Sequence, residues 1–211
     1  MVDNRFEYGF RWSKANGGSP CPQGSEFSVA DAYQATVGGN VDLGVGDPVI
    51  RVSDGSVALA AAGGPIFGII TGIERYWDGE REVKGTVVPG GSTGSSNLKR
   101  ETRVLVTLAS HGLWEIMADD NVTQTTEAGY RGLIHSNADI SLTRTQINNK
   151  WRASPRLDVD TADTSADKQL RIMEVSKSLH NEDFSGANVH LIVAINETGQ
   201  ATQAATTIGG V

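Results

Sequence analysis

Residues 47–60 read Asp-Pro-Val-Ile-Arg-Val-Ser-Asp-Gly-Ser-Val-Ala-Leu-Ala, and this stretch decides the fold class. Two short apolar runs, rich in β-branched residues, flank the dipeptide Asp54-Gly55. An Asp-Gly pair between apolar runs is the strongest short-range signal for a β-hairpin, because the tight turn needs positive φ angles that glycine adopts without strain. The stretch therefore predicts two antiparallel strands joined by a turn at Asp54-Gly55.

Strand signals recur along the rest of the chain. Apolar or alternating segments occupy residues 65–73, 82–88, 102–108, 113–117, 170–175 and 189–196, and weaker strand and turn signals occupy residues 142–150. A second pair, Asp78-Gly79, predicts another turn. No segment has the periodicity of an amphipathic helix of about twelve residues, and residues 29–35 are the best short helical candidate. The spacing predicts an all-β fold, a β-barrel or β-sandwich of short antiparallel strands.

The predicted organisation is one β domain between two flanking segments. Residues 1–40 carry aromatic side chains interrupted by a Gly/Ser/Pro segment at 16–25, and they are predicted to form an extended N-terminal arm. Two alternatives are open for this arm: it packs on the domain's own core, or it reaches a neighbouring subunit. The β domain is predicted to span residues 41–197, and the best candidate for an internal boundary lies near 118–129. Residues 198–211 are predicted to form a flexible tail.

Composition and charge argue against several classes of protein. The 211 residues include 18 Lys and Arg and 25 Asp and Glu, a formal net charge of −7, without the basic run expected of a nucleic-acid-binding protein. The single cysteine, Cys21, can form neither an internal disulfide nor a thiolate zinc site. No apolar segment is long enough to span a membrane, and the first residues lack the apolar core of a signal peptide. We expect a protein made in the cytosol, with no nucleic-acid or membrane partner.

Candidate catalytic and metal-binding motifs are incomplete. Residues 90–94, Gly-Gly-Ser-Thr-Gly, match the G-x-S-x-G pattern of a serine hydrolase, but no apolar-striped helix follows Ser92, so an esterase is only a formal alternative. Four aspartates between positions 158 and 167 are spaced like calcium ligands, yet the loop glycine is missing and Gln169 stands where a glutamate should close the site. A solvated acidic loop is predicted there instead. His190, inside an apolar strand, is predicted to be structural. We expect no enzyme activity, no cofactor and no metal site.

The order of features between residues 41 and 119 resembles the head decoration, or capsid cement, proteins of tailed bacteriophages, particularly those of podovirus-like particles. The matching pieces are Gly46-Asp47-Pro48-Val49, Ser53-Asp54-Gly55, Ile66-Phe67-Gly68-Ile69-Ile70-Thr71-Gly72, Arg75-Tyr76-Trp77-Asp78-Gly79, Val87-Val88-Pro89, Arg103-Val104-Leu105-Val106 and Leu113-Trp114-Glu115-Ile116. Residues 189–196, which precede a short tail, resemble the final strand of that family. The resemblance is an ordered pattern over roughly two-thirds of the chain, and residues 123–167 fit it less clearly.

The resemblance implies a viral structural protein that binds the outer surface of the phage head, bridges major capsid subunits and stabilises the head against internal DNA pressure. Its partners would be the major capsid protein and neighbouring copies of itself, as a dimer or trimer, and it would reside in the virion. The aromatic residues that are candidates for capsid contact are Phe6, Tyr8, Phe10, Trp12 and Trp77. Two alternatives share the fold class: a tail or neck component, and a carbohydrate-binding β module with Trp77 or Trp151 in a groove.

Overall fold

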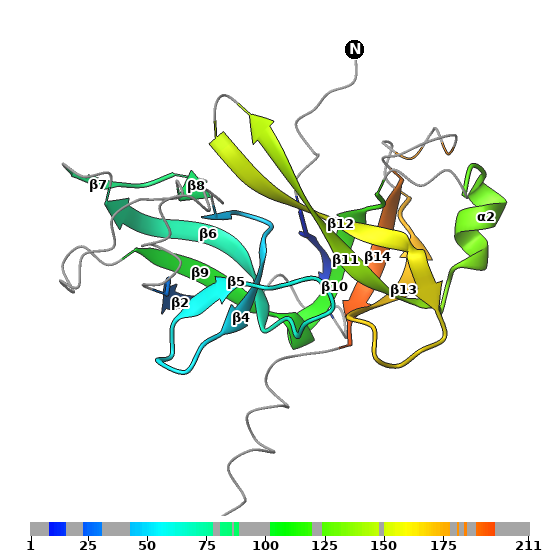
Figure 1. The fold of residues 1–211 in the computed structure, drawn as a ribbon, viewed down its shortest axis with the longest axis horizontal. Helices are drawn as coiled ribbons and strands as arrows, with labels where there is room; N and C mark the ends of the chain where they lie inside the picture. Colours follow the sequence, from blue (N-terminus) through cyan, green and yellow to red (C-terminus); the bar gives the residue numbers. More distant parts are fainter. Residues whose placement is uncertain are drawn as a thin grey trace, which may run out of the picture.

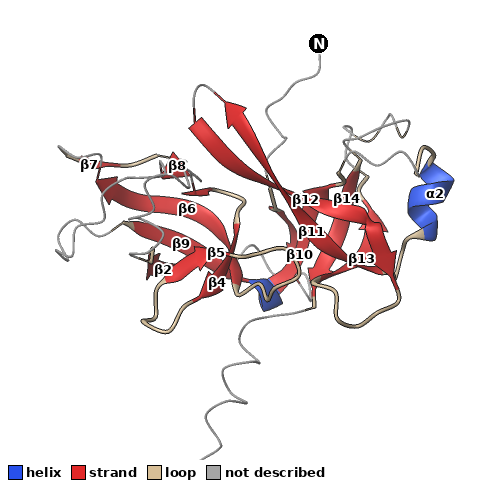
Figure 2. Ribbon diagram, in the orientation of Figure 1, coloured by secondary structure: helices blue, strands red, loops and turns tan. Residues whose placement is uncertain are grey.

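The computed structural model describes residues 9–15, 23–30, 43–77, 81–85, 87–88, 102–119, 124–147, 150–177, 181, 184 and 189–196. For residues 77, 143–147 and 150–154 it describes the backbone alone. This part of the chain is built mainly from antiparallel strands in two large sheets (Figures 1 and 2). The prediction of an all-β fold is confirmed.

The first sheet has six strands in the order β1-β10-β14-β13-β11-β12. These strands are β1 (Arg11–Ala15), β10 (Gly112–Met117), β11 (Asn137–Ile147), β12 (Lys150–Asp163), β13 (Leu170–Val175) and β14 (His190–Ile195). The short helix α2 (Glu127–Gly132) precedes β11, and the Thr126 hydroxyl caps it by accepting a hydrogen bond from the backbone N–H of Gly129. Sequence periodicity does not predict this helix, because six residues are too few to show it.

The second sheet has five strands in the order β2-β9-β6-β4-β5. They are β2 (Ser25–Ser28), β4 (Pro48–Arg51), β5 (Val57–Leu59), β6 (Gly68–Trp77) and β9 (Arg103–Leu108). Two short pairings accompany this sheet: β7 (Glu82–Val83) pairs with the end of β6, and β3 (Leu43–Gly44) pairs with β8 (Val87–Val88). The 3-10 turn η3 (Ala109–His111) leads from β9 to β10. The predicted hairpin is confirmed. β4 and β5 pair across a turn in which Gly55 has a φ of 87° and the Asp54 carboxylate accepts a hydrogen bond from the backbone N–H of Ser56 at 2.9 Å.

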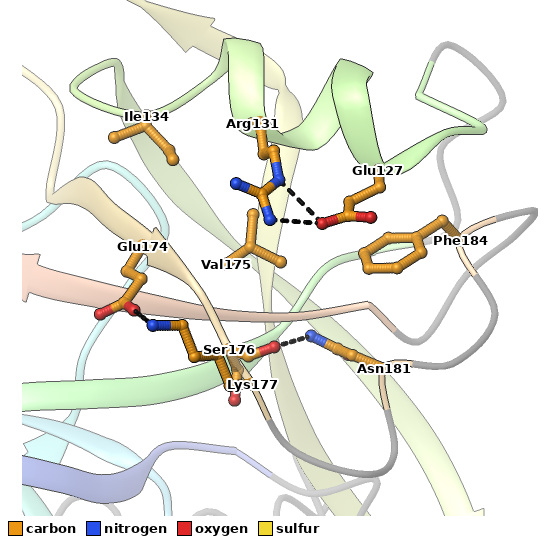
Figure 3. Close-up of a pocket in the computed structure, with 9 residues that line it drawn as sticks. All are labelled: Glu127, Arg131, Ile134, Glu174, Val175, Ser176, Lys177, Asn181 and Phe184. Atoms are coloured by element: carbon orange, nitrogen blue, oxygen red, sulfur yellow. Dashed lines mark hydrogen bonds and ion pairs between the residues drawn. The ribbon is translucent and has the colours of Figure 1, made fainter.

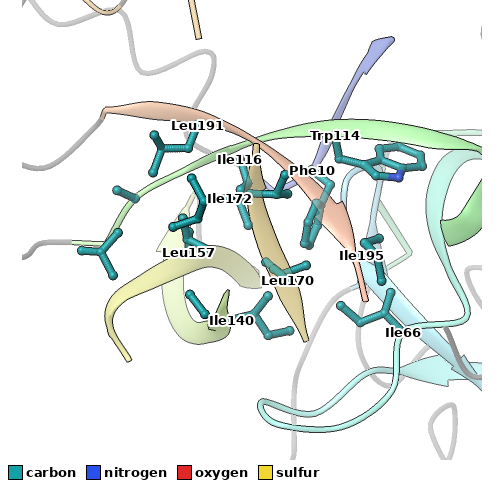
Figure 4. Packing of buried hydrophobic residues seen from close by; sticks show 14 of the residues in the cluster. Phe10, Ile66, Trp114, Ile116, Ile140, Leu157, Leu170, Ile172, Leu191 and Ile195 are labelled. Atoms are coloured by element: carbon teal, nitrogen blue, oxygen red, sulfur yellow. The ribbon is translucent and has the colours of Figure 1, made fainter. Parts of the chain in front are cut away.

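The hydrophobic core joins the two sheets. The larger of two clusters of buried residues contains Trp114, Ile140, Leu157, Leu170 and Leu191 from the first sheet, and also Ile66 and Ile69 from the second sheet and the turn before it (Figure 4). The smaller cluster lies within the second sheet and includes Val49, Ile70, Val104 and Val106. Because one cluster draws on both sheets, they pack as one body.

Gln169 is a buried hydrogen-bonding link between the sheets. Its side-chain amide N–H groups donate to the carbonyl oxygens of Ala61 and Gly64, in the turn between β5 and β6. Its side-chain oxygen accepts from the backbone N–H of Gly63 at 2.9 Å and from that of Ile140, on β11, at 3.1 Å. The side chain is fully buried, so these bonds satisfy both its donors and its acceptor while tying the β5–β6 turn to the first sheet.

The segment predicted as an extended arm supplies strands to both sheets. β1 pairs with β10 at the edge of the first sheet, and β2 pairs with β9 at the edge of the second. Phe10 is 3% exposed, and its backbone N–H donates to the carbonyl oxygen of Gly46 at 2.8 Å. The described parts of this segment therefore pack on the chain's own core, one of the two alternatives left open by the sequence; residues 1–8, 16–22 and 31–40 lie outside the described residues.

Two local predictions differ from the structure. The predicted acidic loop at 158–167 is largely strand, because β12 continues to Asp163 with Leu157 and Val159 buried against the core. Polar and apolar residues alternate along this strand, as expected for a strand with one buried face. The loop was predicted from the aspartates alone, without regard to the apolar residues between them. The helical candidate at 29–35 is extended at its start: Val29 forms an isolated bridge with Val57, and the remaining residues are outside the described part.

Candidate functional site

The hairpin of β11 and β12 extends beyond the rest of its sheet (Figure 1). β11 pairs with β13 only at Asn137 and Ala138, whereas its pairing with β12 continues out to Ile147 opposite Lys150. We call residues 142–156 the hairpin tip. Leu142 packs against the core and Pro155 is buried, so the part of the hairpin that projects from the body lies beyond these two residues, where the described ladder consists of the hairpin's own two strands.

The hairpin tip is basic in an otherwise acidic chain. It contains Arg144, Lys150, Arg152 and Arg156 and no aspartate or glutamate. The register places Arg152 opposite Thr145 and Lys150 opposite Ile147. Because side chains alternate along a strand, Lys150, Arg152 and Arg156 occupy positions on one face of the hairpin. The rest of the chain has 14 basic and 25 acidic residues, out of totals of 18 and 25, so the positive charge of the tip contrasts with the body.

The inner end of the same hairpin carries an acidic cluster, formed by Asp119, Asp158 and Asp160. Asp119 follows β10, and its backbone N–H donates to the carbonyl oxygen of Leu157 at 2.9 Å, while its carboxylate accepts from the backbone N–H of Val159 at 3.2 Å. Burial raises the pKa of Asp119, and the negative charges of Asp158 and Asp160 raise it further against the opposing hydrogen bond from Val159. The three carboxylates repel one another, and the positive charge of Lys168, which is ion-paired with Asp139 at 3.0 Å, also acts on Asp158 and offsets part of their charge.

Asp119→Asn should raise the thermal midpoint of unfolding at about pH 7 and leave it nearly unchanged at about pH 3. The folded state raises the pKa of Asp119 above the ordinary 3.8, so stability falls as pH rises from that value through the folded-state pKa. Asparagine removes the ionisation but keeps the oxygen that accepts from Val159. Thermal melts at both pH values measure the effect, with Asp167→Asn at an exposed turn as control. An equal change at both pH values contradicts this assignment.

A cavity of about 370 Å³ lies between α2 and the end of β13 (Figure 3). Its charged side chains are paired with one another: Arg131 with Glu127, and Lys177 with Glu174 at 3.3 Å. The hydrogen bonds from Lys14 and Lys177 lower the pKa of Glu174. The Glu174 carboxylate is therefore stabilised in its ionised form by the two lysines.

Asn181 lines this cavity, and its side chain makes hydrogen bonds to the backbone of two neighbouring segments. Its side-chain N–H groups donate to the carbonyl oxygens of Ser176 and His190, both at 2.8 Å, and its oxygen accepts from the backbone N–H of His190 at 2.7 Å. The side chain is buried, so it fixes the end of β13 against the start of β14. Asn181 thus has a structural role.

Of the predicted capsid-contact residues, the structure describes the side chains of two, Phe10 and Trp12. Phe10 is buried, and Trp12 is half-buried against Trp114, with ring centroids 5.3 Å apart and planes at 88°. Both therefore serve the chain's own core. Trp77 ends β6, paired with Glu82, and only its backbone is described; Phe6 and Tyr8 lie outside the described residues.

The other motifs singled out in the sequence give no reactive centre in the described residues. His190 is buried with its Nδ1 3.0 Å from the Glu115 carboxylate on the adjacent strand, in agreement with a structural histidine. Ser92 and Cys21 lie outside the described residues. Within the described part, no three His, Cys, Asp or Glu side chains converge as a metal site. None of its helices is long and apolar enough to cross a membrane.

Comparisons of the chain with protein-family models, with curated proteins and with solved structures gave no match. The site is therefore defined by its own geometry: a projecting basic tip and an acidic cluster at the base of the same hairpin. The four cations of the tip form no basic run in the sequence, because they are spread over two segments. Arg144 lies on β11, where the register places it opposite Ala153, and the other three cations lie on β12. A search for charges across a predicted hairpin, instead of for a basic run, would have found it.

Proposed function

We propose that the protein is a capsid decoration protein of a tailed bacteriophage, which binds the outer surface of the head and bridges major capsid subunits. Its partners are the major capsid protein and neighbouring copies of the same chain, and its place is the outside of the virion. The proposal assigns it a binding role without catalysis.

The observation that carries this proposal is the combination of a two-sheet body with a projecting, charged arm. The resemblance of residues 41–119 to head decoration proteins points in the same direction. A body whose two sheets share one core and are further linked by Gln169 can transmit force between two subunits without deforming. An arm projecting from such a body can reach a surface that the body does not itself cover.

The mechanism follows from interfacial area. A protein bound across two capsid subunits adds contacts that must break before those subunits separate. Many copies on one head act together, because a bound copy positions its neighbours and raises their effective concentration. Internal pressure is thereby resisted by the sum of many modest contacts. The net charge of −7 opposes association with host DNA before assembly.

Purified protein should bind saturably to phage heads prepared without it, and should raise the temperature at which those heads release their DNA. Sedimentation of heads with bound protein measures occupancy, and dye access to DNA measures release. Removing residues 1–8 tests the contact candidates Phe6 and Tyr8 while keeping Phe10 and β1, which belong to the core. Reduced occupancy is expected, with removal of residues 198–211 as the control. Absence of binding to heads at micromolar protein contradicts the proposal.

A further inference from the structure

We draw no further inference here: the strongest candidate, the pair of arginines on neighbouring strands of the second sheet, Arg75 of β6 opposite Arg103 of β9, carries none, because each is already ion-paired, Arg75 with Glu82 at 3.7 Å and Arg103 with Glu26 at 2.6 Å, and nothing in the described part of the chain shows what else would bind there.

Discussion

Gln169→Ala should lower the free energy of unfolding by about 3 kcal/mol. The substitution removes the hydrogen bonds from the side chain to the carbonyl oxygens of Ala61 and Gly64, and those it accepts from Gly63 and Ile140. The N–H of Ile140 would then be buried without this partner, and an unsatisfied buried polar group costs about 1–3 kcal/mol. Urea unfolding measures the loss.

Two controls separate hydrogen bonding from packing at this position. Gln169→Met keeps a side chain of similar length without the amide, so it should lose nearly as much stability as alanine. Asp167→Ala, two residues earlier and exposed, should change stability by less than about 0.5 kcal/mol. A methionine variant as stable as the wild type would show that the amide does not link the sheets.

Trp114→Ala should cost about 4 kcal/mol, because it empties a large volume in the shared core. Trp114 is fully buried on β10, between β1 and β14, and it meets Trp12 edge to face. Its cavity cannot be filled by movement of one neighbour, since strands flank it on both sides. Urea unfolding of the variant measures the change, and a loss below about 1 kcal/mol contradicts the described packing.

Trp114→Phe and Trp12→Ala serve as graded controls. Phenylalanine keeps most of the ring and removes the indole N–H, which has no hydrogen-bond partner among the described residues, so its cost should be less than half that of alanine. Trp12 is half-buried, so Trp12→Ala should cost less than Trp114→Ala. The double variant should reveal a coupling of about 1 kcal/mol, the contribution of the edge-to-face contact.

The sequence predicted the fold class well where local chemistry determines it. Asp54-Gly55 forms the turn it predicts, and the strands expected at 102–108, 113–117, 170–175 and 189–196 are β9, β10, β13 and β14. Turn chemistry and β-branched runs act over a few residues, so they can be read directly. The inner part of β12 was not predicted, because its aspartates suggested a loop. Leu157 and Val159, which alternate with these aspartates, are buried in the core.

Long-range pairing explains the other differences. Phe10 and Trp12 look like free aromatic anchors in a segment broken by glycine and proline, but pairing of β1 with β10 places them against Trp114. In the sequence, Gln169 is notable only because it stands where a calcium site would have a glutamate. Its structural role depends on hydrogen bonds to a turn more than one hundred positions away in the chain. No local pattern encodes such a contact.

The number of copies per particle tests the central claim most directly. The proposed function requires a phage whose genome encodes this chain, and the proteins of its purified virions can be denatured and quantified against the major capsid protein. Copies on the order of hundreds, in fixed ratio to the capsid subunits, are expected, since a decorating protein repeats over a symmetric shell. A count near one ring of about a dozen, or absence from the particle, would contradict it.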